Sequence, residues 1–442
     1  MATIVSKSSA ALKGVAHLPG DKSISHRALI LSALATGKSR IKGLSEAEDV
    51  LNTIGALRLL GVICDKKGQD WVIKGHGLGA FRAPEGVLDF GNSGTGARLM
   101  IGALATQPIE VSLTGDESLK KRPMGRILKP LLEMGAKVFP KDAAALPLTL
   151  TGAAEPVAIT YRLPVASAQV KSALLLAGLN IPGETCVIEE TPTRDHTERL
   201  LAQFGVPVKK ETLPGGGAAI TVKGLRELKA ADIAIPGDFS AAAFVLAATL
   251  MVPGSRLEIK GVGLNPLRTG LLDVLGQMGA DIRVSEDSAK AAEPYGGLAV
   301  NYTQLSAVDT DPAMAARMID EFPALFVLAA LADGVSSFRG LAELRLKESD
   351  RLRQMAKGLE ACGVEVKEFD DGLAISGRAG KVPGGAVIDA SGDHRIAMAF
   401  AVLGLRADKP VTIKGTESIS TSFPGFAKLM HRLGANIEET FE

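Results

Sequence analysis

The segment LRLLGVIC (57–64) decides the fold, because it joins the end of an amphipathic helix to the start of a strand through a glycine at position 61. Glycine is the residue that most readily adopts the left-handed backbone conformation with which many helices end. The same pattern returns five times, centred on Gly135, Gly205, Gly279, Gly363 and Gly434. The intervals between successive glycines are 74, 70, 74, 84 and 71 residues. A repeat this regular predicts six similar units of about 70 residues each.

A second pattern lies within each unit: a small or polar opening is followed by an almost wholly apolar helix. It covers residues 20–35, 91–105, 165–179, 237–250, 320–332 and 392–405. A helix that is apolar on every side is buried on every side. The helices that end at the repeated glycines are amphipathic, as Leu352, Met355, Ala356 and Leu359 illustrate, so we expect them to cover the outside. Short β-like runs lie between the helices, at 71–75, 110–115 and 256–261.

Each unit is therefore one buried helix, one covering helix and a few strands, which predicts an α/β protein. A chain of 442 residues is too long for one ordinary core, so we expect two domains of three units each. We predict that residues 21–235 form one domain and that residues 1–20 and 236–442 form the other. The chain would then cross twice, near 19–21 and 235–238, where Pro-Gly pairs lie. The cleft between two domains is the default place for a ligand.

Charge, hydropathy and cysteine usage exclude several classes of protein. Lys and Arg number 50 and Asp and Glu 49, so the chain lacks the basic excess of a protein that coats nucleic acid. Apolar runs such as 324–332 are far shorter than the ~20 residues that span a bilayer, and the N-terminus lacks the apolar region of a secretory signal. Cys64, Cys186 and Cys362 have no disulfide or zinc spacing, so we expect buried, reduced thiols. We expect a cytoplasmic protein without metal, cofactor, membrane or nucleic-acid partner.

Polar residues gather at two places in the units. The N-terminus of the buried helix carries Lys22, Ser23, Arg27, Asn92, Gly94, Thr95, Arg98, Ser167, Gln169, Lys171, Asp320, Glu321, Asp393, His394 and Arg395. The start of the covering helix carries Lys120, Lys121, Arg122, Arg194, Lys347, Glu348 and Arg351. Helix N-termini favour anions, and Arg and Lys bind carboxylates and phosphates. We therefore expect a site for small anions, where glycines allow close approach of the backbone. These are Gly20, Gly91, Gly94 and Gly96.

Taken singly, these groups have simpler explanations. The basic run 120–122 is typical of a solvated loop, and GNSGTG (91–96) could merely cap a helix. Lys347 and Arg351 flank Glu348 and could form a surface ion-pair cluster. Their equivalent places in the repeat favour a shared function instead.

Seven segments resemble the 5-enolpyruvylshikimate-3-phosphate (EPSP) synthase family, in order over essentially the whole chain. They are PGDKSISHRALI (19–30), NSGTGARL (92–99), KRPMGRIL (121–128), SAQVKSALL (167–175), TRDHTERLL (193–201), LRLKESDRL (344–352) and DHRIAMAF (393–400). The resemblance implies an inverted α/β barrel, or β/α prism, with two domains of three βαβαββ units each. It also implies transfer of the enolpyruvyl group of phosphoenolpyruvate to the 5-hydroxyl of shikimate 3-phosphate, with release of phosphate. We expect a monomer.

The resemblance assigns roles by matching positions. Contacts to shikimate 3-phosphate are implied for Lys22, Ser23, Arg27, Ser167, Ala168, Gln169, Arg194, Asp320 and Lys347. Contacts to phosphoenolpyruvate are implied for Lys22, Gly94, Arg122, Gln169, Arg351 and Arg395. For catalysis we expect Asp320 as the base at the substrate hydroxyl and Glu348 as the acid and base at C3. Lys22 is expected as the acid or electrostatic partner at the bridging oxygen.

The chain departs from the family pattern at three positions. Thr421 stands where many members carry a Lys, so that contact to phosphoenolpyruvate is not expected here. Ala168 replaces the second Ser of the commoner SSQ and, with RDHTE (194–198), makes the chain similar to the second, glyphosate-tolerant class. The third departure is from that class, which can carry Ala at the position of Gly94, where a methyl group would crowd the inhibitor, so Gly94 argues against glyphosate tolerance here. We therefore expect Gly94→Ala to weaken glyphosate inhibition.

Three other functions stay open at this point. UDP-N-acetylglucosamine enolpyruvyl transferases share the fold, but carry a reactive Cys in the loop that corresponds to TGDESLKKRPMGR (114–126), which has none. An RNA 3′-phosphate cyclase is disfavoured by the balanced charge and by the lack of its nucleotide-linked His motif. An inert repeat scaffold is disfavoured because so many charges at ligand-facing positions would cost stability.

Overall fold

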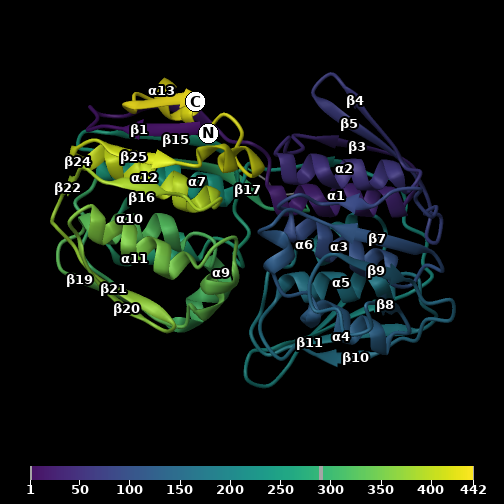
Figure 1. Ribbon diagram of the computed structural model, residues 1–442. Helices are drawn as coiled ribbons and strands as arrows, with labels where there is room; N and C mark the ends of the chain where they lie inside the picture. The colour runs from purple at the N-terminus through teal and green to yellow at the C-terminus, as the bar shows by residue number, and fades with distance from the viewer. Residues whose placement is uncertain (1, 288–291, 442) are drawn as a thin grey trace. The chain divides into compact units, whose positions relative to one another are not determined.

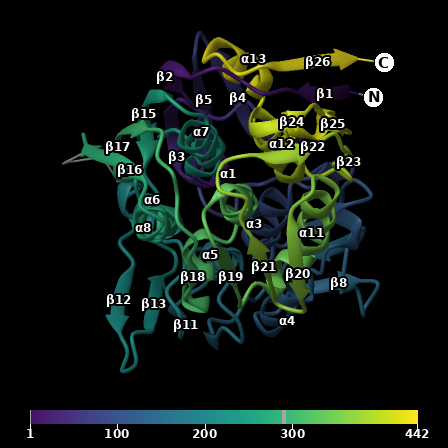
Figure 2. The same cartoon turned by 90° about the vertical axis from the view of Figure 1, so that its left-hand side faces the viewer.

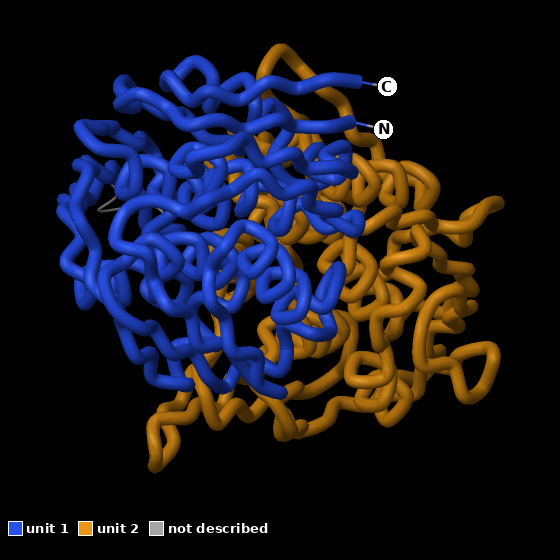
Figure 3. Tube along the Cα trace, turned by 60° about the vertical axis from the view of Figure 1, so that its left-hand side comes forward, with its two compact units in different colours: residues 1–19, 236–442 blue, residues 20–235 orange. Residues whose placement is uncertain are grey.

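The computed structural model describes residues 2–287 and 292–441, in two compact units: residues 20–235, and residues 1–19 with 236–442 (Figure 3). We call them the 20–235 unit and the 236–442 unit. The buried apolar side chains form two separate clusters, one in each unit. Each unit therefore has its own hydrophobic core, which is what stabilises a fold of this size.

The sheets of the 20–235 unit follow one plan, in which the first two strands are parallel and the others antiparallel. The first sheet is β14 (Asp232–Ala234), β3 (Thr36–Lys42), β5 (Asp70–His76) and β4 (Ile63–Lys67). The second is β6 (Leu88–Asp89), β7 (Glu110–Thr114), β9 (Leu148–Thr151) and β8 (Lys137–Phe139). The third is β10 (Thr160–Arg162), β11 (Glu184–Glu189), β13 (Ala218–Lys223) and β12 (Lys209–Thr212).

The 236–442 unit repeats this plan three times. Its first sheet is β2 (Lys13–His17), β15 (Arg256–Gly263), β17 (Tyr295–Asn301) and β16 (Asp281–Glu286). Its second is β18 (Asp309–Thr310), β19 (Val335–Phe338), β21 (Gly372–Ser376) and β20 (Glu365–Phe369). Its third is β23 (Val387–Asp389), β25 (Val411–Lys414), β1 (Ala2–Ser6) and β26 (Ile437–Phe441), while β22 (Val382–Gly384) and β24 (Ala407–Lys409) form a small additional pair. The predicted α/β class with six repeated units is confirmed.

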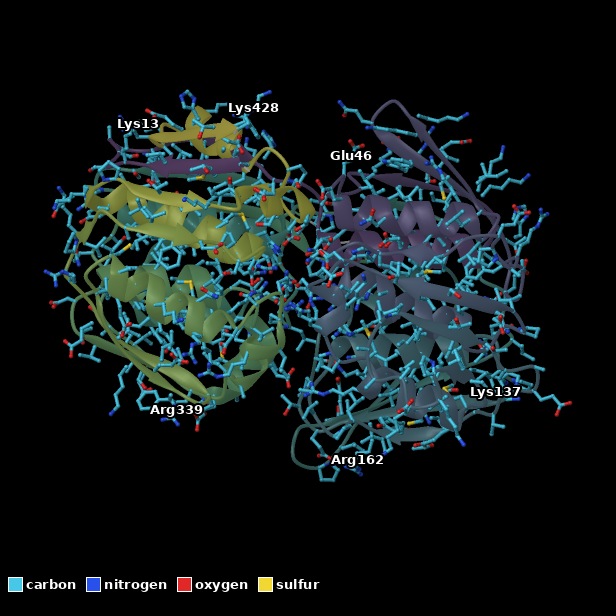
Figure 4. The ribbon with its side chains drawn as sticks, in the orientation of Figure 1. Lys13, Glu46, Lys137, Arg162, Arg339 and Lys428 are labelled. Carbon is cyan, nitrogen blue, oxygen red and sulfur yellow. The ribbon has the colours of Figure 1, made fainter. Side chains whose placement is uncertain are left out.

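Three buried helices fill the centre of each unit, with the sheets around them (Figure 1). They are α1 (Lys22–Leu34), α3 (Gly94–Leu104) and α5 (Ala168–Gly178) in one unit, and α7 (Phe239–Met251), α10 (Phe322–Leu331) and α12 (His394–Leu403) in the other. Every residue of α7, α10 and α12 is buried, as their almost wholly apolar composition predicts. Charged side chains such as Lys13, Lys137 and Arg339 are exposed and lie away from these helices (Figure 4).

Six covering helices end at the repeated glycines. They are α2 (Glu48–Leu59), α4 (Gly125–Glu133), α6 (His196–Gln203), α8 (Gly270–Gln277), α11 (Arg351–Ala361) and α13 (Phe426–Arg432). Each following glycine has a positive φ, from +83° at Gly205 to +105° at Gly135. After α2, Gly61 N donates to Arg58 O and Val62 N donates to Leu57 O, which is a Schellman motif, and the other five helices end in the same way. The prediction that glycine terminates these helices is confirmed.

Three strands complete sheets whose other strands are distant in sequence. β2 pairs with β15 across more than 200 residues, and β14 pairs with β3. β1 lies between β25 and β26, so the two ends of the chain run side by side (Figure 2). The first residues of the chain therefore belong to the sheets of the 236–442 unit.

The cysteines agree with the expectation at two positions of three. Cys64 and Cys362 are buried, and burial raises the pKa of each thiol to about 12. Cys186 is only half-buried, so the expectation was wrong there, because alternate side chains of β11 point to its less buried face. None of the helices in the described residues is long and apolar enough to cross a membrane.

Candidate active site

The start of α1 places two predicted substrate ligands on the 20–235 unit. Asp21 caps the helix by accepting a hydrogen bond of 2.9 Å from the Ile24 amide. Lys22 is the first helical residue, and its Nζ donates to Asp49 Oδ2 at 2.8 Å. Ser23 follows, and its carbonyl oxygen accepts a hydrogen bond of 2.9 Å from Arg27 Nη1. The Lys22 ammonium is thus held at the helix N-terminus, where α1 also favours an anion.

Arg27 lies one turn further along α1 and is almost completely buried, at 3% exposure. Its Nε donates to Thr197 Oγ1 at 2.8 Å, and its Nη2 donates to Ser172 Oγ at 2.9 Å. These hydroxyls come from α6 and α5, so the guanidinium is fixed by helices that are distant in sequence. Such fixation suits a cation that recognises a phosphate with defined geometry.

His26 links the same helix to its neighbours. Its Nδ1 lies 2.8 Å from Thr53 Oγ1 of α2, and its Nε2 lies 3.3 Å from Ser93 Oγ. Ser93 in turn caps α3 by accepting from the Gly96 amide at 3.0 Å. Burial, with the nearby Lys22 and Arg27 cations, lowers the pKa of His26 well below its ordinary value. The ring is therefore a neutral spacer between α1, α2 and the start of α3.

Two further arginines lie beside the N-terminus of α3. Arg122 is buried at 6% exposure and follows the short 3₁₀ helix η1 (Leu119–Lys121). Its Nη2 donates to Asn92 Oδ1 at 2.7 Å and to Ser118 Oγ at 3.2 Å. An alanine side chain at Gly94 would place its Cβ 3.0 Å from Arg122 Nη1 and 2.8 Å from Arg98 Nη1. The glycine therefore leaves room for two guanidinium groups.

The start of α5 carries the predicted segment 167–169. Ser167 caps the helix by accepting from the Val170 amide at 3.3 Å, and Ala168 is the first helical residue. The Gln169 amide accepts from Arg98 Nη1 at 3.0 Å and donates to Thr95 Oγ1 at 2.9 Å. Gln169 is thereby brought next to the Gly94 turn. The half-buried Arg194 lies in the segment between β11 and α6.

The other glycines expected to approach a ligand have neighbours within the protein. A Cβ at Gly20 would lie 1.9 Å from the Gly43 carbonyl oxygen, and one at Gly96 would lie 2.6 Å from Thr53 Oγ1. A Cβ at Gly91 would lie 2.4 Å from Asn52 Nδ2. Packing of the chain against itself thus accounts for glycine at Gly20 and Gly96, and a positive φ of +51° adds to it at Gly91, while the approach of a ligand to these positions stays a prediction.

A second cluster lies on the 236–442 unit and is built around Arg351, the first residue of α11. The side chain is 1% exposed, and its Nε donates to Asp393 Oδ2 at 2.8 Å. Its Nη2 donates to Glu348 Oε2 and lies 3.3 Å from Asp393 Oδ1. Nη1 has no hydrogen-bond partner within residues 2–287 and 292–441, although Asp320 Oδ1 lies 3.5 Å away. Burial alone would lower the pKa of Arg351, but Asp393, Glu348 and Asp320 together raise it.

Asp320 stands among three cations of this cluster, just before α10. Its Oδ1 lies 3.7 Å from Lys347 Nζ and 3.5 Å from Arg351 Nη1. Its carbonyl oxygen accepts from Arg395 Nη1 at 2.9 Å. Arg395 is itself buried at 6% exposure, near the N-terminus of α12 that Asp393 caps. The surface ion-pair interpretation of residues 347–351 was wrong, because Arg351 is buried and the pairs continue to Asp393 and Asp320.

Comparison with known proteins identifies the family. The sequence profile described as EPSP synthase (3-phosphoshikimate 1-carboxyvinyltransferase) matches residues 6–430. A protein of Parvibaculum lavamentivorans named 3-phosphoshikimate 1-carboxyvinyltransferase is 51% identical over 435 residues, which are 98% of this chain and 96% of the relative. The chain belongs to the EPSP synthase family.

Solved structures agree with this membership. The solved structure of EPSP synthase from Acinetobacter baumannii matches this chain with a TM-score of 0.87 and 41% sequence identity, and the match covers 100% of both chains. An enolpyruvyl transferase from Streptomyces tendae, at 18% identity, shares the fold with a TM-score of 0.77. The inverted two-domain α/β architecture implied by the sequence resemblance is thereby confirmed.

Three residues that bind predicted site residues were not themselves predicted as site residues. Asp49 binds Lys22, Arg98 binds Gln169, and Asp393 binds Arg351. Arg98 and Asp393 were noticed as polar residues of the repeat, whereas Asp49 resembles an ordinary acidic residue in the first turn of a helix. Among the described residues, His, Cys, Asp and Glu form no group of three that could hold a metal ion.

Proposed function

We propose that this protein carries out the reaction of the EPSP synthase family, with residues at the starts of α1, α3 and α5 and of the cluster around Arg351. The enolpyruvyl group of phosphoenolpyruvate is transferred to the 5-hydroxyl of shikimate 3-phosphate, and phosphate is released. One observation carries the assignment of roles: Arg351 is held by Asp393 and Glu348 through Nε and Nη2, while its buried Nη1 makes no hydrogen bond within the described residues. A buried donor of this kind needs a partner, and a substrate carboxylate or phosphate would supply one.

Shikimate 3-phosphate is bound mainly by residues at the starts of α1 and α5. We assign this role to Lys22, Ser23, Arg27, Ser167, Ala168, Gln169, Arg194, Asp320 and Lys347. Arg27 and Lys22 are held in place by hydrogen bonds to neighbouring residues, which supports fixed recognition of a phosphate. The two helix N-termini add partial positive charge at the same places.

Phosphoenolpyruvate is bound by the arginines beside α3 and by those of the second cluster. We assign this role to Lys22, Gly94, Arg122, Gln169, Arg351 and Arg395. Arg suits the task, because its planar fork matches both the carboxylate and the phosphate of this substrate. Gly94 contributes by leaving space for the guanidinium groups of Arg98 and Arg122.

The reaction needs three proton transfers, one at the substrate hydroxyl and two at C3, and a leaving phosphate. The oxygen of the substrate hydroxyl forms a bond to C2 of the enol while Asp320 takes the hydroxyl proton. The electron pair of the C2–C3 double bond forms a new bond between C3 and a proton. C3 then loses a proton, the double bond returns, and the C2–O bond to phosphate breaks with the electron pair leaving on phosphate. We assign the proton transfers at C3 to Glu348, and Lys22 stabilises charge at the bridging oxygen. Asp320 has Lys347 and Arg351 close by, which orients its carboxylate.

The direct test measures phosphate release from phosphoenolpyruvate with either shikimate 3-phosphate or UDP-N-acetylglucosamine as the acceptor. We expect release with the first acceptor only, and a kcat lowered by about 10²- to 10⁴-fold in Asp320→Asn, which keeps the side-chain volume but removes the base. Release with UDP-N-acetylglucosamine, or with neither acceptor, would overturn the proposed function. No feature described above favours a second function. The monomeric state, the cytoplasmic location and the similarity to the second class stay predictions.

A further inference from the structure

A buried ammonium group in the 20–235 unit has no part in the mechanism proposed above. Lys171 lies in the first turn of α5, and its side chain is 1% exposed. Its Nζ lies 3.1 Å from Glu189 Oε2 and 2.8 Å from Glu198 Oε1, and it donates to the Thr193 carbonyl oxygen at 3.2 Å. The partners come from the end of β11, from the start of α6, and from the segment between them. One side chain thus ties three pieces of chain to α5.

The segment between β11 and α6 is fixed most firmly at Thr193. Its amide donates to Glu189 Oε2 at 3.1 Å, and its hydroxyl donates to the same oxygen at 2.7 Å. Its carbonyl oxygen accepts from Lys171, so all three polar groups of this residue are bonded within the cluster. Arg194, which we assign to shikimate 3-phosphate, is the next residue. The backbone from which Arg194 extends is therefore set by Lys171 and Glu189.

Residues next to this cluster in the sequence bind another cation, Arg27. Ser172 follows Lys171, and Thr197 precedes Glu198. Both hydroxyls accept hydrogen bonds from Arg27, and Thr197 Oγ1 donates to Ser172 Oγ at 2.8 Å. The same contact between α5 and the start of α6 thus fixes Arg27 as well.

We propose that Lys171 is a positioning residue for shikimate 3-phosphate, which through Glu189 and Thr193 holds Arg194 in a fixed place relative to residues 167–169 and Arg27. This inference rests on the proposed function. Apolar side chains of similar volume would hold the same elements together as well as a buried ion-pair group does, and often better. Apolar contacts lack direction, whereas bonds to all three polar groups of Thr193 fix its orientation. Fixing the orientation of Thr193 therefore explains the charges of Lys171 and its carboxylate partners better than a contribution to stability alone.

The test uses Thr193→Val, which keeps the shape of the side chain and removes only the hydroxyl that donates to Glu189, and Thr193→Ser, which retains it. In Thr193→Val we expect the KM for shikimate 3-phosphate to rise about tenfold, in keeping with the loss of a hydrogen bond to a charged group. The KM for phosphoenolpyruvate should stay within about twofold, and Thr193→Ser should restore the KM for shikimate 3-phosphate. Calorimetric titration should show the same tenfold change in the Kd of shikimate 3-phosphate.

Thr249→Val is the matched control, because the hydroxyl of Thr249 is also buried but donates to the Val245 carbonyl oxygen in α7, at 2.7 Å. We expect it to lower the melting temperature without changing either KM. If Thr193→Val does likewise, the role of the cluster is purely structural and the inference is overturned. Should Thr193→Val not fold, Glu198→Gln replaces it, because it weakens the anchor of α6 on Lys171, and an unchanged KM for shikimate 3-phosphate would then be equally decisive. A wild-type protein that releases no phosphate contradicts the proposed function instead, so the two failures are distinguishable.

Discussion

Gly94→Ala tests whether the space beside α3 for the guanidinium groups of Arg98 and Arg122 matters for the binding of phosphoenolpyruvate. Gly94 is the first residue of that helix and its φ is not positive, so the backbone accepts alanine without strain. The new Cβ would lie 2.8 Å from Arg98 Nη1 and 3.0 Å from Arg122 Nη1, whereas ordinary contacts begin at 3.4 Å. The two guanidinium groups must therefore retreat by about 0.6 and 0.4 Å. Both are ends of flexible side chains, so we expect the protein to fold normally.

The retreat disturbs bonds that hold the arginines in place. Arg122 Nη2 lies 2.7 Å from Asn92 Oδ1, and Arg98 Nη1 lies 3.0 Å from Gln169 Oε1. Hydrogen bonds of charged groups contribute about 1.5–3 kcal/mol each, so a partial loss of one such bond to the substrate costs ~1–2 kcal/mol. This corresponds to a KM for phosphoenolpyruvate raised about 5- to 30-fold. The same methyl group should raise the inhibition constant of glyphosate.

The assay is steady-state phosphate release with phosphoenolpyruvate varied at saturating shikimate 3-phosphate, with and without glyphosate. Gly55→Ala is the control, because Gly55 lies on the exposed side of α2 and no atom is within 4 Å of its would-be Cβ. It should raise the free energy of unfolding by about 0.5–1 kcal/mol and leave the kinetics unchanged. A KM within twofold of wild type in Gly94→Ala would refute the steric reasoning. Equal inhibition constants for the two forms would refute the expectation about glyphosate.

Three further predictions concern charged groups. Lys171→Met leaves the buried Glu189 and the half-buried Glu198 without their cation and should lower the free energy of unfolding by about 3–5 kcal/mol, measured by urea denaturation. His26 is neutral in the folded protein because its pKa is lowered, whereas in the unfolded chain it takes up a proton below about pH 6.5. Stability should therefore be lost as the pH falls below 6.5, by at most about 1.4 kcal/mol per pH unit from this group, and urea titrations between pH 7.5 and 5.5 should give a smaller slope for His26→Gln. Arg351→Lys keeps the charge but not the fork, so kcat/KM for phosphoenolpyruvate should fall at least about tenfold, and an unchanged value would exclude the proposed role of Nη1.

The helices could be predicted because their determinants are local. A glycine such as Gly61 or Gly363 ends a helix through its own backbone and two hydrogen bonds within seven residues, so sequence spacing suffices to find it. The buried helices are equally plain, since an uninterrupted apolar composition such as that of α10 has no exposed face.

The pairing of β14 with β3 could not be predicted in the same way. β14 is the three-residue segment Asp232–Ala234, which is too short to show alternation, and its place beside β3 depends on hydrogen bonds to residues almost 200 positions earlier. The two-residue strand β18 has the same difficulty. Pairings of this kind depend on the assembled units, and no local pattern in the sequence expresses them.

In the candidate site, the charges that we assign to substrate binding were easier to find in the sequence than the charges that hold them in place. Lys22 and Arg351 stand in distinctive segments, whereas their partners Asp49 and Asp393 are acidic residues at helix starts, where such residues commonly serve only as caps or dipole partners. Asp393 does cap α12, through its bond to the Arg395 amide at 2.9 Å, and it binds Arg351 with the same carboxylate. The capping role of Asp393 can be predicted from the sequence, whereas its ion pair with Arg351 cannot.

The double role of Asp393 bears on how the second cluster meets an anion. Asp320, Glu348 and Asp393 carry three formal negative charges, which Lys347, Arg351 and Arg395 balance. Because these charges sum to zero, the cluster attracts an anion only weakly from a distance. Its contribution to anion binding must therefore come from hydrogen-bond donors that are already in place. Because Asp393 and Glu348 hold the buried Arg351 from two sides, binding need not reorganise the guanidinium, and Nη1 can meet a substrate oxygen directly. A balanced charge over the whole chain is thus compatible with strong anion recognition, provided that carboxylates orient the cations and do not merely cancel them.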